Sequence, residues 1–250
     1  MRRVDQETVD ASAQNLSGDG SSWLWVLNAA AGCGDVQATG EGGRILDVRE
    51  IWDDAPHSAF TDLIRYGDSW LCVFREGRDH VSPDGAIRVI RSTDGRRWLS
   101  SARIHCDGAD LRDPKIIFAP DGRLMIVAAA ARDRGPHGQA RQQSMAWFSR
   151  DASSWDDGHE IGPRDWWLWR VTWHQGTAFA VGYETAAPRP SVRLFRSPDG
   201  LHYETLVDRL YQDGFPNESV LVFLADETCL CLLRRDAGTK TGLLGIALPP

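Results

Sequence analysis

The chain has 250 residues, of which 42% are hydrophobic, so it can bury one large core or two small ones. Its formal net charge is −7 and its Lys and Arg residues form no cluster, which argues against a nucleic-acid-binding protein. No stretch approaches the ~18 consecutive apolar residues of a membrane-spanning helix, so we expect neither nucleic acid nor a membrane among its partners.

Residues 1–43 predict a polar and partly disordered arm, because few apolar side chains occur in residues 1–20. Within this arm, SSWLWVLNAAAG at 21–32 predicts a strand or a short helix without deciding between them. The amino terminus lacks the apolar core of a signal peptide, which predicts a cytoplasmic protein. A misassigned start would leave a secreted or periplasmic location open.

Residues 44–250 predict one all-β domain. RILDVREIW at 44–52 alternates like a strand, and four later segments share a plan of short strands separated by Gly-containing turns. The segments recur about every 50 residues, which is the period of a β-propeller blade of four strands. We count three complete blades and most of a fourth. The residues taken as the heads of these segments are Asp62, Asp113, Arg170 and Glu218.

A common turn follows the third strand in three of the segments. Its Asp can accept N–H bonds within the turn, its Gly allows positive φ, and its aromatic residue can pack under the next strand. These turns resemble the Asp box, or BNR repeat, of sialidases (neuraminidases), although they are one residue shorter and Ala152 replaces Gly in the second. The matching residues are Ser92, Asp94 and Trp98, then Ser149, Asp151 and Trp155, then Ser197, Asp199 and Tyr203.

The resemblance covers roughly residues 44–248 and implies a sialidase-like β-propeller, which in that family has six blades. Since no further blade pattern follows the fourth, we expect one of two arrangements. Either the chain is a C-terminally truncated member, or a shorter ring closes with the amino-terminal strand completing the fourth blade. A truncated ring would leave an open blade edge, which favours self-association.

Asp boxes of that family lie opposite the active site, so the resemblance implies that the functional face holds the starts of the inner strands and the ends of the second strands. Arginine and carboxylate side chains there suit an acidic sugar, because guanidinium groups bind a carboxylate while Asp or Glu transfers a proton. The candidates are Asp62, Arg112, Asp113, Arg170 and Glu218 at strand starts, and Arg75, Glu76, Arg132, Tyr183, Glu184, Arg234 and Arg235 at strand ends.

Sialidases use three arginines for the substrate carboxylate, an Asp acid/base, and a Tyr nucleophile assisted by a Glu. The resemblance therefore implies Asp62 as acid/base, Glu218 as the assisting carboxylate and Tyr183 as the one tyrosine on this face, with Asp113 as a further catalytic candidate. Because the family's nucleophile belongs to a late blade, catalysis by these residues alone stays open. The substrate-binding candidates are Arg75, Glu76, Arg112, Arg170 and Arg235.

Three functions follow, all with a carbohydrate partner and none with a metal or cofactor. The main one is an exo-α-sialidase-like glycoside hydrolase that cleaves a terminal sialic acid or a related acidic sugar. The alternatives are a non-catalytic carbohydrate-binding propeller and a five-bladed furanosidase-like glycosidase that uses Asp62, Asp113 and Glu218. The tryptophans at 166–169 predict either packing between blades or a sugar platform, and the C-x-C at 229–231 predicts buried thiols.

Overall fold

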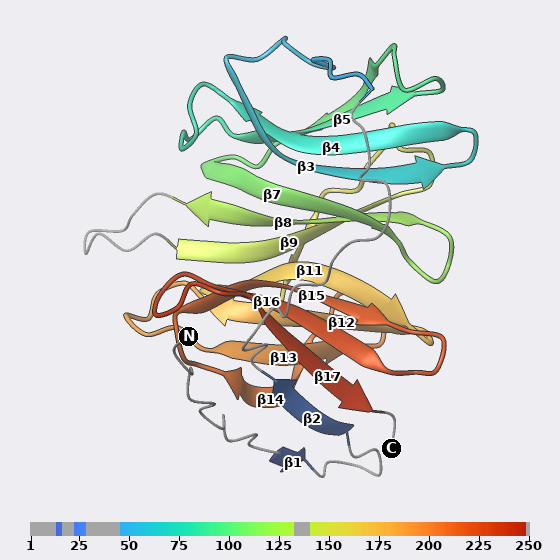
Figure 1. Ribbon diagram of the computed structural model, residues 1–250. Coiled ribbons are helices and arrows are strands. Elements are labelled where there is room, and N and C mark those ends of the chain that lie inside the picture. The colour runs from blue at the N-terminus through green and yellow to red at the C-terminus, as the bar shows by residue number, and fades with distance from the viewer. Residues whose placement is uncertain (1–13, 17–22, 29–45, 133–140, 249–250) are drawn as a thin grey trace, which may run out of the picture.

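The computed structural model describes residues 14–16, 23–28, 46–132 and 141–248. Every regular element in these ranges is a β-strand, and the strands form four antiparallel sheets (Figure 1). The predicted all-β class and the predicted four blades are therefore confirmed. The six blades implied by the family resemblance are not seen.

The first three sheets each contain four strands in chain order, because each strand is joined to the next by a short connection. The first sheet holds β3 (His57–Tyr66), β4 (Ser69–Gly77), β5 (Ala86–Ser92) and β6 (Leu99–Ile104). The second holds β7 (Ala109–Phe118), β8 (Leu124–Arg132), β9 (Arg141–Ser149) and β10 (His159–Ile161). The third holds β11 (Trp166–His174), β12 (Thr177–Glu184), β13 (Val192–Ser197) and β14 (Glu204–Tyr211).

The fourth sheet combines the two ends of the described chain. It runs β15 (Pro216–Phe223), β16 (Cys229–Arg235), β17 (Leu243–Leu248), β2 (Trp23–Asn28) and β1 (Gln14–Leu16). Strand β2 pairs antiparallel with β17, and it lies in the span that the sequence analysis assigned to the arm. The apolar run at 21–32 thus contains a strand, and an amino-terminal strand completes the fourth sheet.

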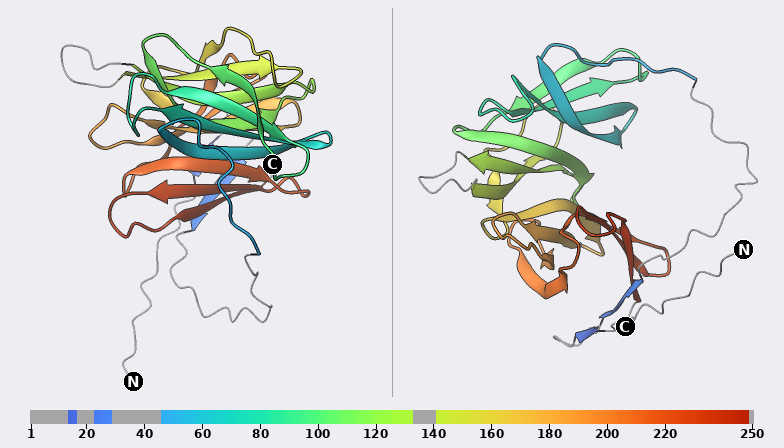
Figure 2. Two further views of the ribbon diagram at one scale, coloured as in Figure 1. Left: turned by 90° about the horizontal axis from the view of Figure 1, so that it is seen from above. Right: turned by 60° about the vertical axis from the view of Figure 1, so that its left-hand side comes forward.

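The four sheets follow one another along an arc, with the first strand of each sheet at its inner edge (Figures 1 and 2). Neighbouring inner strands β3, β7, β11 and β15 contact one another in that order. Three apolar clusters fill the spaces between successive sheets and hold Leu71 and Trp147, Met125 and Phe195, and Leu194 and Leu233. The core is therefore divided into layers that fix the spacing of the inner strands.

The two ends of the arc differ in how their outward faces are covered. On the first sheet, Ile51 and Trp52 pack over Phe74. They belong to residues 46–52, which are irregular, so the strand predicted at 44–52 is wrong in its described part. On the fourth sheet, Leu232 and Leu248 are about half exposed. Among the described residues the first and fourth sheets make no extensive contact, so the arc is open, and self-association stays a prediction.

Burial alternates along the fourth sheet as the period of two requires. Cys229 and Cys231 point inward and are 1% exposed, whereas Leu230 and Leu232 point outward. Burial raises the pKa of both thiols to about 12, and their position agrees with the predicted buried thiols.

The three predicted turns share one hydrogen-bonding pattern. In the first, Asp94 Oδ1 accepts the N–H groups of Arg96 at 2.8 Å and Arg97 at 2.9 Å, and Ser92 Oγ accepts Gly95 N–H at 2.8 Å. The same bonds recur around Asp151 and Asp199. The fourth residue of each turn, counted from the serine, has positive φ; these residues are Gly95, Ala152 and Gly200. The turns follow equivalent strands, so they lie at the same end of successive sheets.

Candidate functional site

Each inner strand is interrupted by a β-bulge near its start. The pairing register shifts between Ala59 and Asp62 in β3 and between Arg112 and Lys115 in β7, and equivalent shifts occur in β11 and β15. A bulge inserts one residue and turns the following side chains to the other face. The structurally equivalent residues are therefore Phe60, Asp113, Trp169 and Asn217, while Asp62 is equivalent to Lys115. The alignment of Asp62 with Asp113 drawn from the repeat was wrong by two residues.

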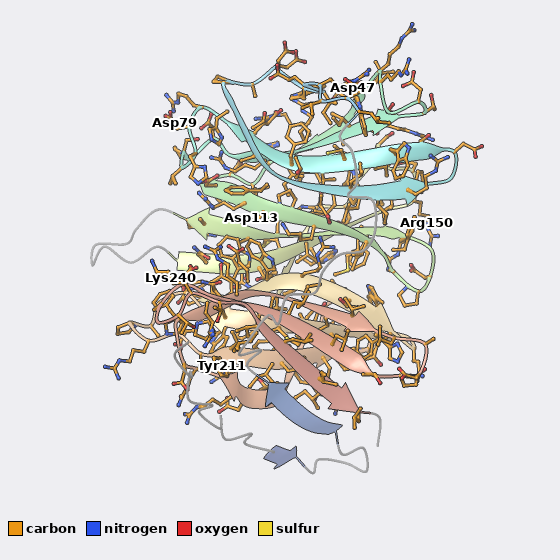
Figure 3. The ribbon with its side chains drawn as sticks, in the orientation of Figure 1. Asp47, Asp79, Asp113, Arg150, Tyr211 and Lys240 are labelled. Atoms are coloured by element: carbon orange, nitrogen blue, oxygen red, sulfur yellow. The ribbon has the colours of Figure 1, made fainter. Side chains whose placement is uncertain are left out.

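A pocket of about 1000 Å³, here called the mouth pocket, lies at the bulged end of the sheets. Figure 3 places Asp113 near this end and Arg150, which belongs to a Ser–Asp turn, at the opposite end. The pocket therefore lies at the end of the sheets opposite the turns, which is where the functional face was predicted. Its lining residues are Phe60, His80, Val81, Ser82, Pro83, Gly108, Asp110, Arg112, Asp113, Ala131, Arg132, Gln142, Trp167, Trp169, Tyr183, Glu218 and Arg234.

Asp113 is the most perturbed carboxyl group of the mouth pocket. It sits in the β7 bulge with φ of 51°, and it is 7% exposed. Burial raises the pKa of Asp113 from its ordinary value of 3.8 to about 6, with Lys115 and Arg112 opposing the shift and Glu218 adding to it. Within the described part of the chain, its carboxyl group has no hydrogen-bond partner. A carboxyl group of this kind can carry a proton into a neutral-pH reaction.

Glu218 is the second carboxylate of the mouth pocket. It lies in the β15 bulge, between Pro216 and Ser219, and its Oε1 forms a 2.5 Å ion pair with Nη1 of Arg234 on β16. Asp236 also binds Arg234, and the hydrogen bond that Arg234 donates to Glu218 raises the pKa of that guanidinium. The two pocket carboxylates therefore have different surroundings, since the Asp113 carboxyl is buried without a hydrogen-bond partner among the described residues and Glu218 is paired with a cation.

Three aromatic rings form one wall of the mouth pocket. Trp167 and Tyr183 stack at 5.7 Å with an interplanar angle of 19°, and Trp169 lies 5.5 Å from Trp167. Burial, reinforced by Glu218 and Asp113, raises the pKa of the Tyr183 phenol far above its ordinary value. Tyr183 is therefore a neutral phenol at physiological pH, and the wall offers flat apolar faces to a ligand.

Lys115 lies beneath this wall and was not among the sequence candidates. It is 8% exposed, and its Nζ lies 4.7 Å from the centre of the Trp169 ring. The backbone oxygens of Asp113 and Pro114 are 3.4 and 3.5 Å away, so its hydrogen bonds are weak. Burial lowers the pKa of Lys115, which Asp113 and Asp62 oppose. The ammonium group is thus placed to act on Asp113 through space.

Asp62 and Arg170 bind each other and do not line the mouth pocket. Asp62 Oδ1 accepts Nη2–H of Arg170 at 2.7 Å, and its Oδ2 accepts Ile116 N–H at 2.9 Å. Both carboxylate oxygens are occupied, and the contacts join the first three sheets. The structure therefore gives Asp62 a bracing position between sheets, and the acid/base role predicted for it stays a prediction.

Three more predicted residues lie away from the mouth pocket. Arg75 is fully buried and donates to Asp110 at 2.7 Å. Glu76 lies on the outward face of the first sheet; burial acts against ionisation, yet bonds from Arg88 and Arg103 hold the pKa of Glu76 below its ordinary value. Arg235 binds residues 239–241. None of these side chains is available to a ligand in the pocket.

Arg112 is the only arginine among the five substrate-binding candidates that lines the mouth pocket. Its Nη1 contacts Asp110 at 3.2 Å, and its guanidinium lies over the Phe60 ring at 5.2 Å. His57 and His80 form an edge contact behind Phe60. Within residues 46–132 and 142–248, no group of His, Cys, Asp or Glu is arranged to hold a metal ion, and no helix is long and apolar enough to cross a membrane.

Comparison with known proteins finds similarity in structure and none in sequence families. No family model and no curated protein matches the chain. A protein of unknown function from Dyadobacter fermentans superimposes with a TM-score of 0.64 and 16% identity over 78% of this chain and 67% of that one. The α-L-arabinanase of Penicillium chrysogenum in complex with arabinobiose superimposes with a TM-score of 0.58 and 16% identity, over 75% of this chain and 60% of that one. The family 93 α-L-arabinofuranosidase of Fusarium graminearum superimposes with a TM-score of 0.60 and 12% identity, over 74% of this chain and 58% of that one.

The chain shares a β-propeller fold with glycoside hydrolases. It spans 58% of the arabinofuranosidase, 60% of the arabinanase and 67% of the Dyadobacter protein. At 12–16% identity the superpositions show the fold alone. A sialidase is not among the similar structures named here, so the propeller is supported while the sialidase type is not.

Proposed function

We propose that this chain contributes the active site of a glycoside hydrolase whose acid is Asp113 and whose second carboxylate is Glu218. The observation that carries the proposal is the contrast between them: burial raises the pKa of Asp113 to about 6, while Glu218 is paired with Arg234. Two carboxyl groups with different surroundings can divide the work of acid and base. Asp113 would donate its proton to the leaving sugar oxygen. Glu218 would activate water or attack the anomeric carbon itself.

The substrate we propose is a neutral terminal sugar, as in the furanosidase-like alternative. Arg75, Arg170 and Arg235 are engaged by protein groups outside the mouth pocket, so three of the four arginines predicted to bind substrate do not line it. The aromatic wall offers flat faces to a sugar ring. Two structurally similar proteins are described as an arabinanase and an arabinofuranosidase, which supports a pentofuranoside as the first substrate to test.

The acidic-sugar and non-catalytic functions remain the competing proposals. The acidic-sugar function is favoured by Arg112, Arg132 and Arg234, which all line the mouth pocket. The non-catalytic function is favoured by the Tyr183 phenol, which is neutral at physiological pH and so supplies no ready nucleophile. Each makes a different prediction for the same assay.

The test is a panel of aryl glycosides that includes an α-L-arabinofuranoside and a sialoside. We expect release from the furanoside, and we expect Asp113→Asn and Glu218→Gln each to lower kcat by ~10² to 10⁴. Asp226→Asn, an exposed carboxylate in the β15–β16 turn, is the matched control and should leave kcat unchanged. Sialoside cleavage alone would support the acidic-sugar function. Binding without release from any glycoside would support the non-catalytic one.

A further inference from the structure

A second and smaller cavity, here called the side cavity, lies beside the mouth pocket. Its volume is about 130 Å³. Two of its residues, Arg132 and Gln142, also line the mouth pocket, so the two spaces share a wall. A glycan seated in the mouth pocket therefore lies next to the side cavity. Its lining residues are Arg132, Gln142, Gln143, Glu160 and Arg164.

The side cavity carries more cationic than anionic side chains. Arg164 has no hydrogen bond or ion pair within the described part of the chain. Arg132 lies 3.9 Å from Glu160 Oε1 and 3.5 Å from the Asp107 backbone oxygen, which are long contacts for a guanidinium group. Two guanidinium groups thus face one carboxylate and keep most of their donors unused. Such donors favour an anionic oxygen ligand.

Gln142 differs from the two arginines, because it offers the ligand a hydrogen-bond acceptor. Its Oε1 is buried and has no hydrogen-bond partner in the described structure. A buried acceptor without a partner is unfavourable, so a turn of the Gln142 side chain that brings this oxygen to a donor of the ligand would be favourable. A carboxylate or a sulfate ester has no donor at neutral pH, whereas a sugar hydroxyl group has one. The side cavity therefore suits a sugar that carries an anionic group and a hydroxyl group close together.

The residues of the side cavity are held in place before any ligand arrives. Gln143 donates from Nε2 to the backbone oxygens of Ile161 at 3.0 Å and Gly162 at 3.3 Å. Asp165 Oδ1 accepts Gln142 N–H at 3.2 Å. Gly162 has φ of 64°, and a Cβ there would lie 2.7 Å from Leu168. Arg164 thus stands on a pinned turn, and less ordering is needed on binding.

We propose that the side cavity binds the carboxylate of a uronic acid residue in a glycan whose neighbouring sugar occupies the mouth pocket. The inference rests on the proposed function of the mouth pocket. A volume of about 130 Å³ equals roughly four waters at ~30 Å³ each, so it admits a carboxylate and an adjacent hydroxyl group rather than a whole sugar ring. The substrate class is accordingly an acidic polysaccharide with a neutral terminal sugar.

The test measures binding by calorimetry in the Asp113→Asn chain, which should not consume the ligand. The probes are a disaccharide of neutral galactose linked to galacturonic acid, here called the acid dimer, and the galactose dimer of the same linkage, in which a CH₂OH group replaces the one carboxylate. We expect the acid dimer to bind at least tenfold more tightly. Arg132→Ala and Arg164→Ala should each remove roughly tenfold of that preference. Gln142→Leu should weaken both dimers alike, and Arg209→Ala, an exposed arginine on β14, should change neither.

Equal affinity for the two dimers would overturn the inference, and so would an equal loss in Arg209→Ala. A sulfated galactose dimer that binds as tightly as the acid dimer would overturn the assignment to a carboxylate. Because these measurements need no turnover, an acid-selective chain that cleaves no glycoside would refute the proposed hydrolase and leave the side cavity assigned. A chain that cleaves a glycoside but binds both dimers equally would support the proposed hydrolase and refute the assignment of the side cavity.

Discussion

Asp113→Asn should stabilise the protein at high pH, and the size of the effect follows from the pKa of this group. Its pKa is about 6 in the folded chain against an ordinary value of 3.8. Because the folded pKa is raised, the favourable contribution of protonated Asp113 is present below pH 3.8 and is lost as the pH rises through 6. A difference of about two units at ~1.4 kcal/mol each gives about 3 kcal/mol. Asn carries no charge and avoids this loss.

The assay is urea unfolding of the wild type and Asp113→Asn at pH 4 and pH 8. The stability of the variant relative to wild type should increase by about 2–3 kcal/mol between the two pH values. Asp94→Asn is a control of opposite sign. The N–H groups of Arg97 and Arg96 lower the pKa of Asp94 to about 2, so this carboxylate stabilises the fold above pH 3.8. Removing it should destabilise the protein at pH 8.

The reasoning would be refuted if Asp113→Asn were less stable than wild type at pH 8, or if the two proteins had the same dependence on pH. Combined with the activity assay, the measurement also separates two explanations for lost turnover. A variant that is more stable and inactive has lost a chemical group, whereas an inactive and less stable variant has lost its fold.

Three other changes test separate parts of the structure. Ala152→Gly should increase the free energy of unfolding by up to about 1 kcal/mol and so raise the urea midpoint. The reason is that Ala152 has φ of 65° where its counterparts are glycine. Arg75→Met should cost about 3 kcal/mol, because it leaves buried Asp110 with only its longer 3.2 Å contact to Arg112, and Asp110→Leu in the same chain should recover part of that loss in urea unfolding. Lys115→Met should shift the basic limb of the kcat/KM profile to higher pH, because the ammonium lowers the pKa of Asp113, while Lys115→Arg should keep the limb in place.

The sequence by itself determined the sheet repeat and the end of the sheets that holds the pocket. The turns at Asp94, Asp151 and Asp199 each form within five residues or so, and their bonds depend on local residue types. Alternating apolar residues likewise reveal a strand without knowledge of its neighbours. Repetition of the turn at one place in each segment then fixes which strand ends meet, which is why Asp113, Tyr183 and Glu218 were found among the candidates.

Only the tertiary structure decided which of these charged side chains face a ligand. Each β-bulge changes the face of the residues that follow it; no residue type in β3 marks its position, and Pro114 is the one sequence signal of the bulge in β7. Pairing is also non-local: Asp62 binds Arg170 from another sheet, and Arg75 binds Asp110. A guanidinium group that has a carboxylate partner inside the fold is not free to bind a substrate, and that partner is set by distance in space rather than by spacing along the chain.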